Sequence, residues 1–335
     1  KAGYLSYDFG VMWQGVLSKR EDEFKTPFLH FVTPEEVYVF SDDNPAPWSL
    51  LNKYEFKASE PKQDLNKAQY KAAIKKVHEY LRDGETYEVN FAHRFHGEYE
   101  GNPAEVFRKL NDLNPSPHAC FFNFEPITIA SCSPERLVVG RGKGEQVILE
   151  TRPIKGTVPR GKTEEEDKKY IKQLLASEKD EAELNMIVDL ARNDLGRVCE
   201  EGSVGVDEHR TVESYSHVHH TMSNVRGILK KGQDFVDVLQ AVFPGGSITG
   251  APKIRTMKII DELEPCQRGI YTGSAGYIDE NGQFDFNILI RTLAFQKEQG
   301  RYSYHSGGAI VIDSVADAEY QETMDKAAAL KKALL

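Results

Sequence analysis

The last third of the chain contains two apolar segments joined by a tight-turn sequence. Residues 271–278 and 284–295 are rich in β-branched and aromatic side chains, and Asp279-Glu280-Asn281-Gly282 between them is typical of a hairpin turn. Residues 302–312 follow as a third predicted strand. The strict alternation of strand and helix that builds a doubly wound parallel sheet is absent from the sequence. The pattern therefore predicts an α+β fold, with antiparallel sheets and helices packed outside them.

Helices are predicted where apolar residues repeat every three to four positions. The first spans about residues 65–83 and stops at Gly84, and Asn102-Pro103 has the composition of another helix start. Further helices are predicted for residues 164–176, 179–192, 252–264 and from 316 to the end. Short strands are predicted for residues 37–40, 119–124, 127–131, 136–139 and 146–150. The least regular stretch, residues 41–63, is expected to separate an N-terminal piece, residues 1–60, from a main body, residues 61–335.

Charge and composition exclude several classes of protein. The net charge is −10 and no basic stripe is present, so no nucleic-acid partner is expected. No apolar run reaches the roughly eighteen residues that a membrane span needs, so no membrane is expected either. The four cysteines are far apart and form no CxxC pair, which predicts neither a zinc site nor a disulfide framework. Free thiols indicate a reducing compartment, and we expect a cytoplasmic protein.

Two pairs of acidic residues have helical spacing. Asp180 and Glu183 are three positions apart, as are Glu319 and Glu322, so each pair lies on one face of its helix. Like charges at this spacing repel unless a cation lies between them, and carboxylate oxygens suit Mg²⁺. Solvated acidic helix faces are the commoner explanation of such pairs.

Two glycine-rich turns are candidate anion sites. Residues 243–253 contain Gly245-Gly246-Ser247 and lead into a predicted helix, and Ser306-Gly307-Gly308-Ala309 follows a strand. Glycines allow backbone N–H groups to approach an anion. The alternative for both is a tight connection without a ligand.

Lys155 lies in the segment Arg152-Pro153-Ile154-Lys155-Gly156-Thr157. A lysine in a rigid apolar turn can be desolvated, which lowers its pKa and frees the amine as a nucleophile. Considered alone, such a lysine is more often a surface charge.

The histidines cluster in His217-Val218-His219-His220. On a strand, His217 and His219 share one face and His220 lies on the other. Because no cysteine is near, hydrogen-bonding roles are favoured over a zinc site.

Six stretches in order along the chain resemble the chorismate-utilising enzymes, a family that includes anthranilate synthase component I, aminodeoxychorismate synthase component I, isochorismate synthase and salicylate synthase. The matching stretches are residues 133–136, 152–157, 185–195, 250–253, 290–292 and 306–309. The resemblance implies two large, mainly antiparallel sheets packed together with helices outside, as in anthranilate synthase component I. It also implies that residues 61–335 are a chorismate-binding catalytic domain, and that residues 1–60 are the remnant of a longer N-terminal region packed on it.

Within the family, the residue after Pro153-Ile154 discriminates between activities. Anthranilate synthases carry alanine there, whereas aminodeoxychorismate synthases carry lysine, as this chain does at Lys155. Isochorismate and salicylate synthases carry a water-activating lysine at the position of Glu88, so hydration at C2 is disfavoured here. Glu88 is a departure, because relatives of the aminodeoxychorismate type usually have glutamine. The resemblance thus implies conversion of chorismate and ammonia to 4-amino-4-deoxychorismate, for 4-aminobenzoate and folate synthesis.

The resemblance also implies a role for each site residue. Lys155 is the nucleophile that adds at C2, and Glu135 is the general acid on the C4 hydroxyl. Mg²⁺ bridges the ring carboxylate to Glu183 and Glu322, with Asp180 and Glu319 assisting; Asp180 replaces the usual glutamate. The remaining residues are expected to bind substrate or to offset charge: Arg291, Gly308, Ala309, His220, Ser247, Tyr271, Lys253 and Lys326.

Ammonia must come from a source outside this chain, because the sequence contains no Gly-x-Cys-x-Gly elbow of the glutamine amidotransferase kind. The resemblance therefore implies a separate glutamine amidotransferase subunit. Two alternatives are kept: anthranilate synthase component I, and a non-catalytic chorismate-binding subunit. The joint presence of Glu135, Lys155 and the four helix carboxylates argues against the second.

Overall fold

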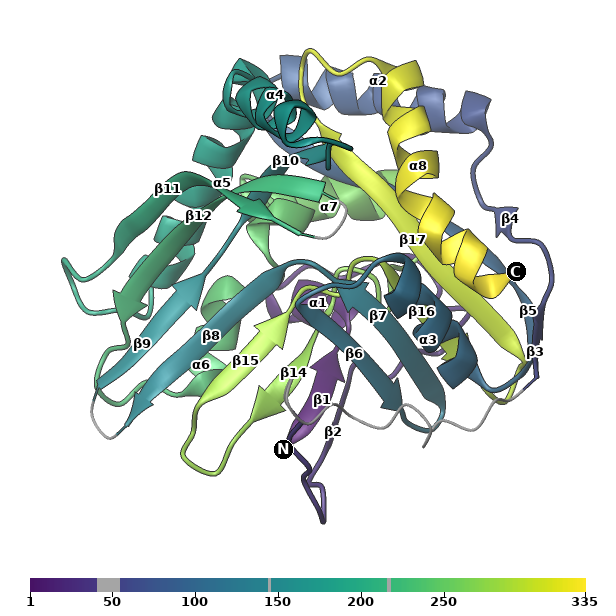
Figure 1. The fold of residues 1–335 in the computed structure, drawn as a ribbon, viewed down its shortest axis with the longest axis horizontal. Helices are drawn as coiled ribbons and strands as arrows, with labels where there is room; N and C mark the ends of the chain where they lie inside the picture. The colour runs from purple at the N-terminus through teal and green to yellow at the C-terminus, as the bar shows by residue number, and fades with distance from the viewer. Residues whose placement is uncertain (41–54, 144–145, 216–217) are drawn as a thin grey trace.

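Two antiparallel sheets form the centre of the molecule, and helices cover their outer faces (Figure 1). The computed structural model describes residues 1–40, 55–143, 146–215 and 218–335. The prediction for the start of the irregular stretch, residues 41–54, and the predicted role of His217 lie outside the described residues. The α+β fold with two antiparallel sheets is confirmed, since every strand pair among the described residues is antiparallel.

The first sheet has nine strands and contains the N-terminus. Its strand order is β10 (Ile154–Pro159), β12 (Val218–Ile228), β9 (Gln146–Thr151), β8 (Arg136–Lys143), β15 (Phe284–Asn287), β14 (Ser274–Ile278), β1 (Ala2–Leu5) and β2 (Leu29–Val32), with β11 (Gly205–Ser214) paired to β12.

The second sheet has eight strands and is built around the long strand β5. Its strand order is β13 (Gly250–Ala251), β5 (Glu88–Gly101), β17 (Arg301–Ile310), β16 (Thr292–Gln296), β7 (Ile127–Ser133) and β6 (His118–Asn123), with β3 (Phe56–Ala58) and β4 (Lys62–Gln63) also paired to β5. The first 60 residues therefore contribute strands to both sheets, and their origin as a separate region stays a prediction.

Eight α-helices surround the sheets in the described part of the chain. They are α1 (Tyr7–Trp13), α2 (Lys67–Arg82), α3 (Pro103–Leu113), α4 (Glu164–Leu175), α5 (Glu178–Gly196), α6 (Phe235–Val242), α7 (Lys253–Leu263) and α8 (Ala316–Leu334); a short 3₁₀ turn, η2, spans Gly246–Ile248. Within the described ranges, no helix has the length and apolar character needed to cross a lipid bilayer.

Local sequence explains where several helices begin. Asn66 and Gln69 form a reciprocal capping box at the start of α2. Asn102 accepts a hydrogen bond from the Ala104 backbone N–H, and Pro103 occupies the first turn of α3. These caps satisfy backbone N–H groups that have no partner inside the helix. The helices predicted from apolar spacing are accordingly confirmed, with boundaries that shift by a few residues.

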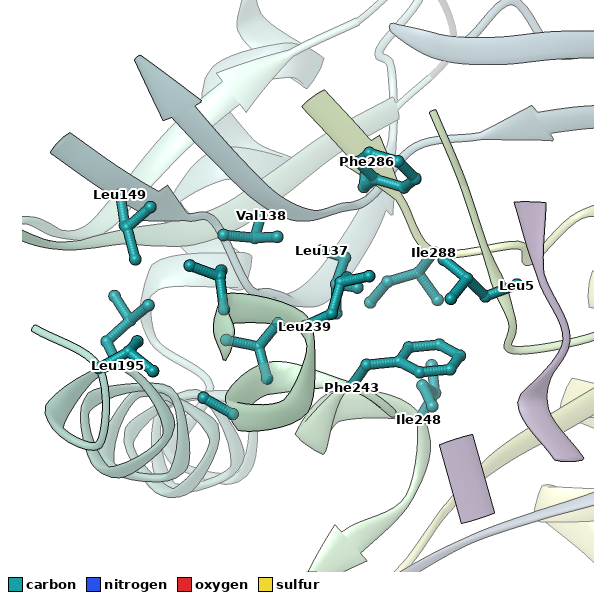
Figure 2. Packing of buried hydrophobic residues seen from close by; sticks show 14 of the residues in the cluster. Leu5, Leu137, Val138, Leu149, Leu195, Leu239, Phe243, Ile248, Phe286 and Ile288 are labelled. Atoms are coloured by element: carbon teal, nitrogen blue, oxygen red, sulfur yellow. The ribbon is translucent and has the colours of Figure 1, made fainter. Parts of the chain in front are cut away.

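The hydrophobic core is divided by the two sheets. One cluster joins the nine-stranded sheet to α5 and α6, and Figure 2 shows Leu195 and Leu239 of these helices near Val138 and Leu149 of the strands. Two further clusters join the eight-stranded sheet to α3 and α8, and to α2 and α7. A fourth cluster lies between the sheets and includes Tyr4. Each fully buried aliphatic side chain contributes about 1.5–3 kcal/mol to stability, so this layered core holds the sheets together.

Two strand predictions are wrong. Residues 37–40 form no strand; their side chains are exposed and lack the buried face that would hold a strand in a sheet. Residues 284–295 do not form one strand but two, β15 and β16, which belong to different sheets (Figure 1). The chain crosses from one sheet to the other at residues 288–291, and a propensity pattern cannot show such a crossing because apolar residues line both sheets.

Candidate functional site

A cavity of about 610 Å³ lies where strands of both sheets meet α5 and α8. Most of the residues that the sequence predicted for the site line it: Glu135, Lys155, Asp180, Glu183, His220, Ser247, Tyr271, Arg291, Ala309, Glu322 and Lys326. Two more, Gly308 and Glu319, lie at its wall, because a Cβ added to Gly308 would be 3.4 Å from Glu322 Oε1 and 3.6 Å from Glu319 Oε2. Residues scattered over almost 200 positions therefore gather around one space.

A β-bulge directs Lys155 into this cavity. The register of β10 against β12 shifts between Lys155 and Thr157, and Gly156 in the bulge has φ +77°. An added Cβ on Gly156 would lie 2.9 Å from Leu174 Cδ1 and 3.1 Å from Asp180 Cγ. Only glycine combines this backbone conformation with such close packing. Gly156 therefore permits the β-bulge that directs the side chain of Lys155 into the cavity.

Lys155 is buried and ion-paired, so the surface-charge alternative is wrong. Its side chain is 11% exposed, and Nζ donates to Glu88 Oε1 at 3.3 Å, to Glu88 Oε2 at 3.4 Å and to Glu183 Oε2 at 3.3 Å. Burial by itself lowers the pKa of Lys155, but the carboxylates of Glu88 and Glu183 outweigh it, and the pKa is raised. The prediction of a lowered pKa is therefore wrong for this state of the site, in which the lysine is an ammonium.

Glu135 has the environment of a general acid. Burial raises its pKa to about 7, although a hydrogen bond of 2.7 Å from Ser247 Oγ to its Oε1 favours the charged form. A carboxyl group with a pKa near 7 is protonated in about half of the molecules at neutral pH and can release that proton to a leaving group.

Glu135 and Arg291 both lie at crossings between the sheets. Glu135 stands between β7 of the eight-stranded sheet and β8 of the nine-stranded sheet, and Arg291 stands just before β16. The crossings are tied together, since Ile288 N donates to Glu135 O at 3.0 Å. Ser133 accepts from the Glu135 backbone N–H at 3.3 Å, and its hydroxyl donates to Ile288 O. The two side chains therefore enter the cavity from a rigid, hydrogen-bonded seam.

Arg291 is suited to hold an anion. It has φ +53°, a left-handed conformation that is uncommon for a residue with a side chain. Its guanidinium is buried, which lowers its pKa, and Nη1 donates to Lys326 O at 3.2 Å. Most of the five donors of a guanidinium are then left for a ligand in the cavity.

Three of the four helix carboxylates, Asp180, Glu183 and Glu322, line the cavity, and Glu319 lies beside Gly308 at its wall. Asp180 and Glu183 come from the first turns of α5, and Glu319 and Glu322 from the first turns of α8. Lysines partly offset them: Lys326 Nζ is 2.5 Å from Glu322 Oε1.

The donor set fits a hard divalent cation such as Mg²⁺. Carboxylate oxygens are its preferred protein ligands, and Gly308, having no side chain, leaves open the space beside Glu319 and Glu322. In the part of the chain that the structure describes, however, no three His, Cys, Asp or Glu side chains form a ready-made metal group. A cation at this place would therefore draw the carboxylates together and complete its shell with substrate and water.

The remaining predicted residues divide between the cavity and other places. His220 lines the cavity and pairs with Thr157 Oγ1 through Nδ1 at 2.8 Å, and burial lowers its pKa. His219 points the other way and pairs with Asp167 at 3.0 Å, which confirms a hydrogen-bonding role. The prediction that Lys253 offsets the metal carboxylates is wrong, because Lys253 forms a buried pair with Asp194 at 2.6 Å.

Several cavity residues were not predicted from the sequence, among them Lys179, Asn90 and His305. Lys179 Nζ is 3.8 Å from Glu183 Oε1, and their i, i+4 spacing was an available signal. Asn90 lines the cavity and donates to Ser247 O at 3.3 Å. His305 stacks on Tyr271, with ring centroids 5.1 Å apart, and no local pattern indicated that contact.

Known proteins are similar in sequence to most of this chain. Aminodeoxychorismate synthase component 1 of Bacillus subtilis is 38% identical over 363 residues, covering 99% of this chain and 76% of the relative. Anthranilate synthase component 1 of Aquifex aeolicus is 45% identical over 273 residues, covering 82% of this chain and 54% of the relative. Aminodeoxychorismate synthase component 1 of Escherichia coli is 45% identical over 276 residues, covering 82% of this chain and 60% of the relative.

Solved structures and a family model agree with these relatives. The crystal structure of anthranilate synthase component I from Streptococcus pneumoniae superposes with a TM-score of 0.81 at 31% identity, covering 98% of this chain and 80% of that one. The model of the family described as chorismate binding enzyme matches residues 1–332. The chain belongs to the chorismate-binding enzyme family, and it is a chorismate-utilising enzyme.

Proposed function

We propose that the chain is the catalytic subunit of an aminodeoxychorismate synthase, which converts chorismate and ammonia to 4-amino-4-deoxychorismate. The observation that carries the proposal is the ion-paired side chain of Lys155 in the same cavity as the buried carboxyl of Glu135, whose pKa is raised to about 7. A nucleophile and a general acid on one substrate ring divide a difficult substitution into two easier steps. Relatives of this activity and of anthranilate synthase activity are both similar to the chain, so the lysine is the deciding feature.

The proposed reaction begins with addition of Lys155 Nζ to C2 of the ring, while Glu135 gives its proton to the departing C4 hydroxyl. Ammonia then attacks C4, and the bond between Lys155 and C2 breaks. Ser247 keeps the carboxyl of Glu135 oriented through its 2.7 Å hydrogen bond. A hydrogen bond from a neighbouring side chain therefore fixes the position of Glu135, as ion pairs with Glu88 and Glu183 fix that of Lys155.

Substrate binding is proposed to rest on charge. Chorismate is a dianion and the chain has a net charge of −10, so local cations must override the overall field. Arg291, the backbone at Gly308 and Ala309, and Tyr271 are proposed to hold the side-chain carboxylate. Glu183 and Glu322, with Asp180 and Glu319, are proposed to hold Mg²⁺, which supplies Lewis-acid polarisation of the ring carboxylate when bound.

Ammonia is proposed to come from a separate glutamine amidotransferase subunit, in the cytoplasm, as a step toward 4-aminobenzoate and folate. In a purified system an ammonium salt replaces that subunit. The assay contains chorismate, Mg²⁺ and ammonium, with and without a separate aminodeoxychorismate lyase. The proposal expects 4-aminobenzoate only when the lyase is present.

The second candidate is anthranilate synthase component I, which the 45% identical Aquifex aeolicus relative favours. It predicts fluorescent anthranilate in the reaction without lyase, and that product would refute the proposal. Absence of both products under saturating Mg²⁺, ammonium and chorismate would instead favour a non-catalytic chorismate-binding subunit. A chelator in excess of Mg²⁺ should abolish turnover, and added Mg²⁺ should restore it.

A further inference from the structure

Arg268 is a buried cation that the proposed mechanism does not use. It lies between α7 and β14, and its side chain is 1% exposed. A guanidinium has five N–H donors, and each of them is engaged here. Two bonds go to Glu264, from Nε to Oε2 at 2.9 Å and from Nη2 to Oε1 at 2.6 Å. The other three go to Asn90 O at 2.6 Å, Ile248 O at 2.8 Å and Thr272 Oγ1 at 3.2 Å.

Glu264 holds this guanidinium in place. It ends α7, its side chain is 3% exposed, and its Oε1 also accepts from the Ala92 backbone N–H at 2.9 Å. A buried charge is costly without its partner, and a bidentate pair fixes the orientation of both groups. The pair therefore ties the end of α7 to β5, and it leaves three N–H groups of Arg268 to bind neighbouring segments.

The contacts of Arg268 close a ring of hydrogen bonds around Ser247. Arg268 holds the carbonyl oxygen of Asn90 on β5 and that of Ile248 in the turn η2. Asn90 Nδ2 in turn donates to Ser247 O at 3.3 Å. Ser247 precedes Ile248 directly, so it is fixed from both sides. Its hydroxyl donates to Glu135 Oε1 at 2.7 Å, and the ring therefore determines where that hydroxyl stands.

The backbone attaches the turn η2 to β5 mainly beyond Ser247. The strand that follows the turn, β13, pairs with β5, and Asn90 N donates to Thr249 O at 2.9 Å. At Ser247 and Ile248, however, the contact with β5 runs through the side chains of Asn90 and Arg268. A buried polar network that is fully satisfied is rigid, because displacing one member leaves others without a partner.

Arg268 also lies against an aromatic ring of the cavity. Its guanidinium carbon is 5.6 Å from the ring centroid of Tyr271, within the range of a cation–π contact. His305 stacks on the same ring, with the ring planes 11° apart. Ser247 and Tyr271 both line the cavity, so Arg268 supports two parts of the cavity wall from behind.

We propose, on the basis of the proposed function, that Arg268 is a positioning residue for the general acid. Held by Glu264, it fixes Ser247, and Ser247 fixes the carboxyl of Glu135 against the C4 hydroxyl of the substrate. Arg268 touches neither the substrate nor the reacting atoms. Its effect on kcat therefore passes through Ser247, and its loss should matter only while the Ser247 hydroxyl is present to be positioned.

The test is a double-mutant cycle on kcat, with chorismate, Mg²⁺ and ammonium. Arg268→Lys keeps a positive charge beside Glu264 but loses the planar fork that binds Asn90 O and Ile248 O together. We expect kcat to fall by about 10–100-fold, the scale of a misplacement of about 1 Å, with a smaller change in the KM for chorismate. In a Ser247→Ala background, the same substitution should lower kcat by less than about threefold.

The pH profile supplies a readout that a loss of stability would not move. Ser247→Ala removes a hydrogen bond that favours the charged carboxyl, and Arg268→Lys loosens the same bond. Both should move the alkaline limb of kcat upward, by at most about one unit, and the double variant should move it no further than Ser247→Ala. The charged side chains that lower the pKa of Glu135 are Lys155 and Lys326, and neither is changed. Free ammonia is held constant.

Leu110→Ala is the control for stability. Leu110 is fully buried on α3, in the cluster that joins α3 and α8 to the eight-stranded sheet, and it does not line the cavity. Its truncation destabilises the core but should leave kcat and the alkaline limb of the folded protein unchanged. If Arg268→Lys does not fold, Glu264→Leu combined with Arg268→Met replaces it, because apolar side chains often substitute for a buried ion pair with little loss of stability. The same fall in kcat is expected.

The outcomes separate the role of Arg268 from the proposed function. An undiminished kcat in Arg268→Lys, an alkaline limb that stays at the wild-type pH, or an equal loss with and without the Ser247 hydroxyl overturns the role of Arg268 alone. Anthranilate from the wild type overturns the proposed function, and the cycle measured on anthranilate formation then still decides the role of Arg268. A wild type that forms neither product overturns both.

Discussion

Replacement of Glu135 by glutamine should abolish turnover and, above neutral pH, stabilise the protein. Burial raises the pKa of Glu135 from 4.5 to about 7, which corresponds to about 3 kcal/mol of preference for the neutral carboxyl in the folded state. Glutamine has nearly the same shape and accepts the hydrogen bond from Ser247, but it never ionises and cannot donate an acidic proton. The same substitution therefore separates catalysis from stability.

The sign of the effect on stability follows from proton binding. Between pH 4.5 and 7 the folded protein binds more protons at Glu135 than the unfolded chain does, so this group's contribution to stability is present below that window and lost as the pH rises through it. Glu135→Gln should match the wild type in free energy of unfolding at about pH 4, and exceed it by about 3 kcal/mol at about pH 8. Urea unfolding at a series of pH values measures both.

The pH dependence of kcat should also report the titration of Glu135. Wild-type kcat should fall about tenfold per pH unit above a midpoint near 7, because the general acid must be protonated. Free ammonia is held constant across the series, since ammonium titrates as well. Ser247→Ala removes a hydrogen bond to the charged form and should move the alkaline limb upward by about one unit. A flat kcat across this range, or a Glu135→Gln variant less stable than wild type at about pH 8, would refute the reasoning.

Three further substitutions test the site by other measurements. Lys155→Ala leaves Glu88 buried without its partner and should lower the free energy of unfolding by about 3–5 kcal/mol; adding Glu88→Gln should recover most of that loss in urea unfolding. Arg291→Gln removes a buried cation and should raise the KM for chorismate by about 10–100-fold in steady-state kinetics, and an unchanged KM would exclude Arg291 from carboxylate binding. Gly156→Ala places a Cβ against Asp180 at φ +77° and should cost at least about 1–2 kcal/mol of stability; calorimetry showing a variant as stable as wild type would mean that the bulge can relax.

Much of the fold was predictable because it depends on local chemistry. The capping residues Asn66 and Asn102 mark helix starts within a few positions, and Asp279-Glu280-Asn281-Gly282 does turn the chain between β14 and β15. Caps and turns satisfy the backbone within a few residues of themselves, so their pattern is legible in one dimension. Residues 37–40 show where local patterns fail. They have the composition of a strand, but no neighbouring element buries their side chains, and they form no strand.

The residues of the candidate site could be predicted from the sequence, but their protonation states could not. Family motifs pointed to Glu135, Lys155 and the helix carboxylates, and the structure brings them to one cavity. Their protonation could not be predicted from order along the chain, because a pKa depends on burial and on charges that arrive from distant segments.

Lys155 shows most clearly which features of the site come from the sequence and which from the tertiary structure. The sequence by itself determined a lysine beside a glycine that permits a bulge. The tertiary structure alone decided that Glu88, 67 positions earlier, and Glu183 on α5 surround its amine and raise its pKa. It also decided that crossings between the sheets place Glu135 and Arg291 in the same cavity. Electrostatic interactions act through space over a few ångströms, and only the folded chain determines which charges come that close.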